Sequence, residues 1–424
     1  QQQQLLWTHY QLGMSLLNGV YTETNLTEAF RLFRLAADQG HAGAQNSLGF
    51  MYKNGKGVPQ SDENAVKWFR LAADQGHAGA QNNLGGMYYE GKGVEKDLTE
   101  AFRLFESAAA QNHAVAQVNL GMMYLNGNGV EQSYEKAVEN YLKAAEQNHA
   151  EAQFNLGNCY YNGEGVEQNY EKTVECYQKA AAQNHAEAQH NLGVMYEIGE
   201  GVPQNFTKAR ELYEQAAAQN HAGSQCYLGV MYENGKGVPQ DKETLELECS
   251  QLGILIGDLA KEPVTDYIQL LQETIALKRY EKAAAQGNAE AQFYLGFMYE
   301  IGKGVPQSDA LAANWYHKAA AQGHALAQYN LGVMYEKGEG VPEDAEEAVR
   351  WYQKAAELGH AEAQNDLGKM YDNGKGVVQS YEKAVEWYRK AANQGHTQAQ
   401  NNLGVMYANG QGVAKDLTEA VRLF

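Results

Sequence analysis

Residues 150–166 read AEAQFNLGNCYYNGEGV, and close versions of this stretch recur along the whole chain of 424 residues. Its Leu-Gly pair is the most regular element, because anchor leucines followed by Gly stand every 36 residues. The anchors are Leu12, Leu48, Leu84, Leu120, Leu156, Leu192, Leu228, Leu295, Leu331, Leu367 and Leu403. The single irregular gap, from 228 to 295, is 67 residues, which is one period plus 31. The sequence therefore predicts eleven copies of one unit in a continuous solenoid, with one insertion.

Two recurring signals mark helix ends along the chain. Thirteen residues after each anchor stands Asn, Asp or Ser, such as Ser61, whose side chain accepts hydrogen bonds from the free N–H groups of a helix start. Eight residues before an anchor stands Gly or Asn, such as Gly40, which tolerate the left-handed backbone that ends a helix. We therefore expect a first helix over about 41–53 and a second over about 63–75, repeated in each copy.

A Gly-x-Gly-Val turn such as Gly55-Lys56-Gly57-Val58 joins the two helices. A phosphate-binding glycine loop follows a strand and opens a helix with wider spacing, so we interpret these glycines as positions of positive φ. The anchor Gly lies inside the first helix, where Gly costs about 1 kcal/mol relative to Ala. We expect close approach of one helix backbone to the next to require it.

The composition excludes several classes of protein. The net charge of −19, from 33 basic and 52 acidic side chains, argues against nucleic-acid binding. No apolar run approaches the roughly 18 residues of a membrane span. Four irregularly spaced cysteines predict neither a disulfide framework nor a zinc site. The chain opens with four Gln, without a Met or a signal peptide at its start, so we interpret it as a processed or trimmed piece. We slightly favour an extracytoplasmic or secreted location over the cytoplasm.

The blocks AEAQFNLG (150–157), YYNGEGV (160–166) and YEK (170–172) resemble the Sel-one-like repeat (SLR) family. That family is similar to tetratricopeptide repeats, but here the period is 36 and a Gly-x-Gly turn is added. The resemblance covers nearly the whole chain except the insertion. It implies an all-α fold, an α/α solenoid wound as a right-handed superhelix, whose members act mostly as adaptors in protein complexes. It implies no catalytic residues.

Several repeated polar columns have structural explanations. Nine of the twelve histidines follow the helix-ending residue, but no other metal ligand recurs with them, so we assign them to turn or first-turn packing. Gln and Tyr columns three before and four after the anchor are expected to satisfy backbone groups between stacked helices, and a Met column to fill the core. Ser133 and Ser380 open Ser-x-x-Lys motifs but stand in the helix-capping column, where Asp or Asn replaces them. We therefore predict no catalytic, metal or cofactor site and no enzyme activity.

Cys159 and Cys176 fall on inward positions of one copy. They are interpreted as small core substitutions, although a disulfide between them is conceivable in an oxidising compartment. The regular Cys pairs of the cysteine-rich branch of the SLR family are absent.

Partner specificity in a repeat protein is expected at the positions that vary between copies. On the first helix, the positions two before, two after and five after the anchor share one face. The first two of these columns turn aromatic and apolar in the middle of the array. If this face lines the groove of the superhelix, it could hold an extended or helical protein segment, whereas the alternative is that the second column packs against the next helix. The candidate groove residues are Phe154, His190, Phe293, Phe297 and Tyr329.

The insertion interrupts the seventh copy. Leucine- and isoleucine-rich stretches flank Pro263, which suits the end of one helix and the start of another. We predict repeats over 1–241, an inserted helical hairpin over 242–275, and the same solenoid resuming over 276–424. The insertion is either a partner-binding element, a change in superhelix direction or a tolerated addition.

The two ends of the array suggest a second function. Only three residues of the 36-residue frame separate the end of one chain from the start of another. Head-to-tail stacking would then give a filament or ring, whereas the alternative is a cut within a longer array. The candidate contact residues are Leu5, Leu6, Trp7, Val421, Leu423 and Phe424. The favoured function remains a non-catalytic scaffold that binds a protein or peptide partner, without nucleic acid or a membrane span, with a self-assembling structural protein and homo-oligomer as the alternative.

Overall fold

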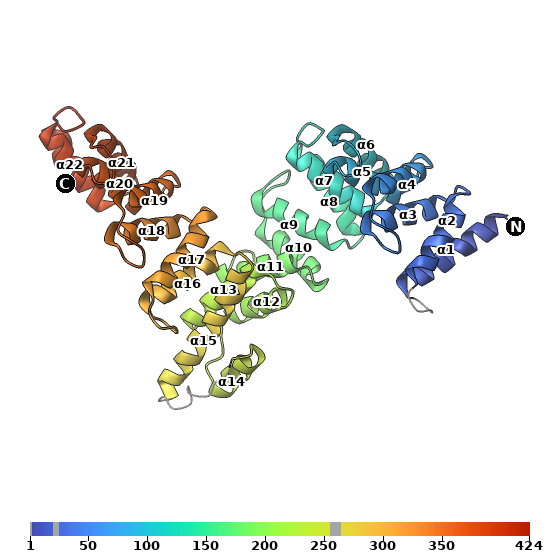
Figure 1. Cartoon of the computed structure of the whole chain (residues 1–424), viewed down its shortest axis with the longest axis horizontal. Helices are drawn as coiled ribbons and strands as arrows, with labels where there is room; N and C mark the ends of the chain where they lie inside the picture. The colour runs from blue at the N-terminus through green and yellow to red at the C-terminus, as the bar shows by residue number, and fades with distance from the viewer. Residues whose placement is uncertain (1, 20–24, 255–263) are drawn as a thin grey trace. The chain divides into compact units, whose positions relative to one another are not determined.

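The computed structural model describes residues 2–19, 25–254 and 264–424, and the elements in these ranges are all helices (Figure 1). The first helices of the copies are α1 (Gln2–Asn18), α3 (Ala42–Asn54), α5 (Ala78–Glu90), α7 (Ala114–Asn126), α9 (Ala150–Asn162), α11 (Ala186–Ile198), α13 (Ala222–Asn234), α16 (Ala289–Ile301), α18 (Ala325–Lys337), α20 (Ala361–Asn373) and α22 (Thr397–Asn409). The second helices are α2 (Leu26–Ala37), α4 (Asp62–Asp74), α6 (Leu98–Ala110), α8 (Tyr134–Glu146), α10 (Tyr170–Ala182), α12 (Phe206–Ala218), α15 (Val264–Ala285), α17 (Asp309–Ala321), α19 (Ala345–Glu357), α21 (Tyr381–Asn393) and α23 (Leu417–Leu423). A further helix, α14 (Lys242–Gln251), precedes α15.

The chain forms two compact units, Gln1–Gln204 and Asn205–Phe424. Within each unit, a first helix packs against the second helix of its own copy, and that helix packs against the first helix of the next copy. The predicted all-α solenoid of 36-residue helix pairs is confirmed. Helix ends lie within about one residue of the expected positions, since Ala42–Asn54 and Asp62–Asp74 replace the predicted 41–53 and 63–75.

The predicted capping chemistry explains these boundaries. Ser61 Oγ accepts a hydrogen bond from the Asn64 N–H at 3.2 Å and starts α4. Gly76 ends that helix region with φ of 82°, and Asn148 takes the same left-handed conformation with φ of 59°. In the Gly-x-Gly turn, a Cβ on Gly57 would lie 2.5 Å from the Leu26 carbonyl oxygen. The turn therefore packs directly on the start of the preceding second helix, which only Gly permits.

The anchor glycines have a different cause from the expected one. A Cβ on Gly332 would lie 2.5 Å from the Tyr352 ring, and a Cβ on Gly229 would lie 2.6 Å from the Tyr280 ring. The anchor Gly thus makes room for a buried aromatic side chain of the second helix in its own copy, rather than for a neighbouring backbone. The aromatic ring fills the centre of the helix pair, and this packing recurs along both units.

The insertion changes the second helix of the seventh copy. α14 begins at the expected cap, where Asp241 accepts a hydrogen bond from the Thr244 N–H at 2.9 Å. Tyr280 of α15, and not a residue of α14, provides the ring over Gly229, so the C-terminal half of α15 is the second helix of this copy. α14 packs against α15 (Figure 1). The inserted hairpin predicted over 242–275 has no separate end near 275, because α15 continues without a break from Val264 to Ala285. Pro263, Leu255 and Ile256 lie outside the described residues.

Candidate functional site

Two polar columns build the stack. Gln364 Nε2 donates to the Ala356 carbonyl of the preceding copy at 3.0 Å, and its Oε1 accepts from Gln394 Nε2 at 2.8 Å. The Gln column therefore satisfies a helix C-terminus between copies, as predicted. The histidines are helix N-caps, since His77 Nδ1 accepts a hydrogen bond from the Ala80 N–H at 3.1 Å. Their role is more specific than the turn packing expected from sequence.

Three of the predicted groove residues take part in packing between copies. Each ring lies between an aromatic residue of its own second helix and the capping His of the next copy. The centroid distances are 5.8 Å to Tyr177 and 4.9 Å to His185 for Phe154, 5.7 Å to Tyr316 and 4.7 Å to His324 for Phe293, and 5.8 Å to Tyr352 and 4.8 Å to His360 for Tyr329. These three side chains are half-buried, so most of each ring surface supports the stack.

The column two after the anchor is more exposed. Phe297 on α16 and Met122 on α7 are each 38% exposed, although both are large and apolar. Phe50 and Val405 at the same position are also exposed. His190 of the other column is half-buried on α11. Phe154 and His190 belong to the N-terminal unit, and Phe293, Phe297 and Tyr329 to the C-terminal unit.

The first-helix face of the N-terminal unit is hollowed at two places. A pocket of about 280 Å³ lies over α5 and α7 and includes Gly86, Tyr89 and Met122. A second, of about 380 Å³, lies over α9 and α11 and includes Asn158, Tyr161 and Val194. All six of these residues stand two or five positions after an anchor, and Phe297 stands two after its own. These columns therefore line surface depressions large enough to receive side chains of a partner.

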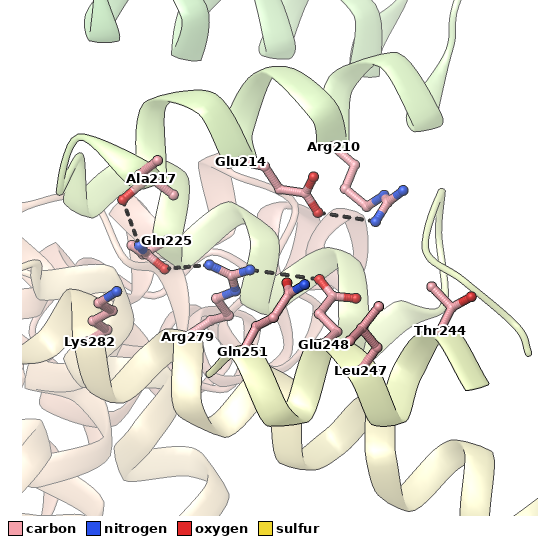
Figure 2. Close-up of a pocket in the computed structure, with 11 residues that line it drawn as sticks. Arg210, Glu214, Ala217, Gln225, Thr244, Leu247, Glu248, Gln251, Arg279 and Lys282 are labelled. Atoms are coloured by element: carbon pink, nitrogen blue, oxygen red, sulfur yellow. Dashed lines mark hydrogen bonds and ion pairs between the residues drawn. The ribbon is translucent and has the colours of Figure 1, made fainter. Parts of the chain in front are cut away.

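A third pocket, of about 390 Å³, lies wholly in the C-terminal unit, where the insertion meets the stack. Helices α12, α13, α14 and α15 contribute to it, and Figure 2 shows Arg210 and Glu214 of α12 facing Arg279 and Glu248 of α15 and α14. Arg210 Nη1 lies 3.1 Å from Glu214 Oε1. Arg279 Nη2 lies 3.7 Å from Glu248 Oε1, with only 11% of each of these two side chains exposed.

This third pocket has more basic than acidic side chains, although the chain as a whole is acidic. Burial raises the pKa of Glu214, and the charge of Arg210 opposes that rise only in part. Arg279 Nη1 also donates to Gln225 Oε1 at 3.1 Å, whereas in other copies the Gln at the C-cap of the second helix, such as Gln394, donates this bond. Sequence reasoning missed these residues. The sequence does show Arg at positions that hold apolar residues in other copies. Only the placement of α14 shows that these arginines line one pocket.

The chemistry of the remaining candidates is restricted. All four cysteines are buried and free, and burial raises the pKa of Cys159 to about 12 and of Cys176 to about 11, in line with core substitutions. Among the residues that the structure describes, no group of three or more His, Cys, Asp or Glu could hold a metal ion. Within the same ranges, no helix is long and apolar enough to cross a membrane.

The predicted end-to-end contact residues lie on α1 and α23, except Phe424, which directly follows α23. The exposed side chains among them are Leu5, Trp7, Val421 and Phe424, whereas Leu6 and Leu423 pack against the cores of their own units. Contact between copies of the chain stays a prediction.

Known proteins place this architecture in a family. The chain is 38% identical to a protective antigen of uropathogenic Escherichia coli with an SLR fold, with a TM-score of 0.67 over 99% of this chain and 83% of that one. It is 31% identical to a Sel1 repeat protein from Oxalobacter formigenes, with a TM-score of 0.57 over 80% of this chain and 90% of the other. No curated protein matches the chain.

The model of the Sel1 repeat covers nearly all of the sequence. The matched segments are 8–41, 42–77, 78–113, 114–149, 150–185, 186–221, 222–244, 274–288, 289–324, 325–360, 361–396 and 397–424. The segments 222–244 and 274–288 are the two parts of the interrupted seventh copy, so these twelve matches correspond to eleven units. Proteins built from this repeat are generally protein-interaction scaffolds and are typically non-catalytic. The chain belongs to the Sel1 repeat family.

Proposed function

We propose that this chain is a non-catalytic scaffold that binds a segment of a partner protein on the face of its first helices. The observation that carries the proposal is the column two after the anchor. Met122 and Phe297 of this column keep 38% of their surface exposed, and the first-helix face has pockets in the N-terminal unit, one of them lined by Met122. Exposed apolar side chains beside such depressions are typical of protein-binding surfaces.

The aromatic residues between copies have a supporting role in this proposal. Phe154 and Tyr329 stack on the capping His of the next copy, so they hold neighbouring first helices in register. Alanine at these positions would weaken the stack as well as any contact with a partner. Met122 and Phe297 are therefore cleaner probes, because their exposed surface can be removed with less effect on the core.

A random peptide library selected against the whole chain supplies a probe without knowledge of the natural partner. We expect Met122→Ser or Phe297→Ser to weaken binding of the selected peptides about tenfold, the effect of losing one buried apolar contact of about 1.4 kcal/mol. Leu71→Ser is the matched control, because Leu71 is 41% exposed but lies on the second helix α4. Equal loss in the control, or no loss in either test variant, would contradict the proposal.

A further inference from the structure

The pocket at the insertion contains two arginines at positions that are apolar in other copies. Arg210 stands 18 residues after its anchor, where most copies have Val. The equivalent residues are Val66, Val138, Val174, Val349, Val385 and Val421. Without the 31 inserted residues, Arg279 would stand 20 residues after its anchor, Leu228. Other copies have a large apolar residue at this position, namely Trp315, Trp351, Trp387, Leu104 or Leu212. Two buried apolar positions have thus been replaced by cations at the same place.

These arginines are not fully satisfied within the structure. Only 11% of the Arg279 side chain is exposed, and its Nε is buried without a hydrogen-bond partner. The Nε of Arg210 is likewise buried and unpartnered. Burying a guanidinium group is costly unless its donors are paired, and the other copies show that this helix pair folds with Val and Trp at the same positions. Stability of the repeat therefore does not explain the two arginines.

The pocket has an excess of positive charge. Arg210, Arg279 and Lys282 contribute three cations, and Glu214 and Glu248 contribute two carboxyl groups. Burial raises the pKa of Glu214, which increases this excess when that group is protonated. Lys282 is exposed at the pocket and has no hydrogen bond or ion pair to any residue in the described ranges. An anionic ligand would complete the set of partners for these cations.

The lining also has an apolar part. Leu247 of α14 is 60% exposed, and Ala217 and Ala218 of α12 also line the pocket. A guanidinium group matches the planar, two-oxygen geometry of a carboxylate. We propose that this pocket, which the inserted helix α14 borders, binds a carboxylate adjoining an apolar side chain, as at the C-terminus of a partner polypeptide. Arg210, Arg279 and Lys282 would bind the carboxylate, and Leu247 the apolar group. This site is separate from the first-helix face and does not depend on that face binding a peptide.

The test uses N-acetyl-leucine as the probe and N-acetyl-leucinamide as its uncharged match. Binding to the full chain is followed by ligand-observed NMR titration. We expect the acid to bind about tenfold or more tightly than the amide, because charge-assisted hydrogen bonds to arginine are lost in the amide. Equal binding of the two compounds would overturn the proposal. So would binding of inorganic phosphate without binding of the acid, which would indicate a general anion site.

The replacements for the two arginines are residues that other copies already have at these positions. Arg210→Val restores the common residue, and Arg279→Leu combined with Glu248→Gln removes the second arginine without leaving its carboxylate unpaired. Each is expected to reduce affinity for N-acetyl-leucine about tenfold while the helical circular dichroism is retained. Arg350→Val, which removes an exposed arginine elsewhere in the same unit, should leave binding unchanged. If the double variant fails to fold, Arg210→Val alone decides, and unchanged affinity in it overturns the proposal.

Discussion

Two adjacent glycines of α5 are expected to respond in opposite ways to the same substitution. A Cβ on Gly85 would lie 2.9 Å from Cε1 of Phe105 and 3.3 Å from the Ala101 carbonyl oxygen. A Cβ on Gly86 would meet nothing within 4 Å. Both residues lie inside the helix, so Ala gains about 1 kcal/mol of helix propensity at either position. Only packing distinguishes them.

The magnitudes follow from these distances. Carbon atoms in contact prefer separations of about 3.5–4.0 Å, so the ring of Phe105 would have to move by roughly 0.6–1.1 Å in Gly85→Ala. Phe105 is buried in the core, and overpacking there costs about 1–3 kcal/mol. After the propensity gain, Gly85→Ala should destabilise the chain by up to about 2 kcal/mol, whereas Gly86→Ala should stabilise it by about 1 kcal/mol.

Urea unfolding by circular dichroism, with hydrogen exchange of amides in residues 78–110, measures both effects. Exchange is needed because a solenoid of two units can unfold in more than one step. Gly86→Ala should slow local opening and Gly85→Ala should accelerate it. Stabilisation by both substitutions to the same extent would refute the account of the anchor glycine as a space for the aromatic ring.

Three further predictions concern the turns and the core. His77→Ala should cost about 1 kcal/mol in urea unfolding because the Ala80 N–H loses its acceptor, whereas His77→Asn should restore the cap; equal stability of all three chains would contradict the capping role. Burial lowers the pKa of His77, so on acidification the unfolded state binds a proton before the folded state does. The stability contributed by neutral His77 should therefore be lost as pH falls below 6.5, and this pH dependence should be smaller in His77→Asn. Gly93→Ala should destabilise by more than about 1 kcal/mol, since its φ is 65° and its Cβ would overlap the Asp62 backbone, whereas Gly76→Asn, at a φ of 82° with open space, should be nearly neutral by the same measurement. With its pKa raised to about 12 by burial, Cys159 should resist a thiol reagent at pH 8 in the folded chain and react after unfolding in urea, and rapid labelling of the native chain at this residue would show that the core around it opens.

The sequence pattern predicts the helix pairs well because their ends depend on local chemistry. Ser61 and Gly76 act within a few residues of themselves, so their roles follow from spacing alone. The capping role of His77 was harder to predict from the sequence, because His is not among the usual capping residues. A signal was present, since Asn288 stands in the same column and caps α16 in the same way.

Contacts between distant parts of the chain were harder to predict. The aromatic residue whose ring covers an anchor Gly stands 20 residues further along the chain. This contact can be predicted only if the angle at which the two helices pack is known. Arg210 and Arg279 are visible departures from their columns, but their convergence depends on where α14 lies after the insertion. The pattern of repeats contains no information on that placement, because the insertion occurs only once.

Hydrogen exchange of the whole chain, with and without a peptide selected from a random library, tests the proposed function most directly. The account predicts that protection on binding concentrates on first helices, at residues around Met122 in α7 or Phe297 in α16, with little change on the outer surface of second helices such as α4 around Leu71. Protection confined to the second helices, or absent from both first-helix regions while the peptide is bound, would contradict it.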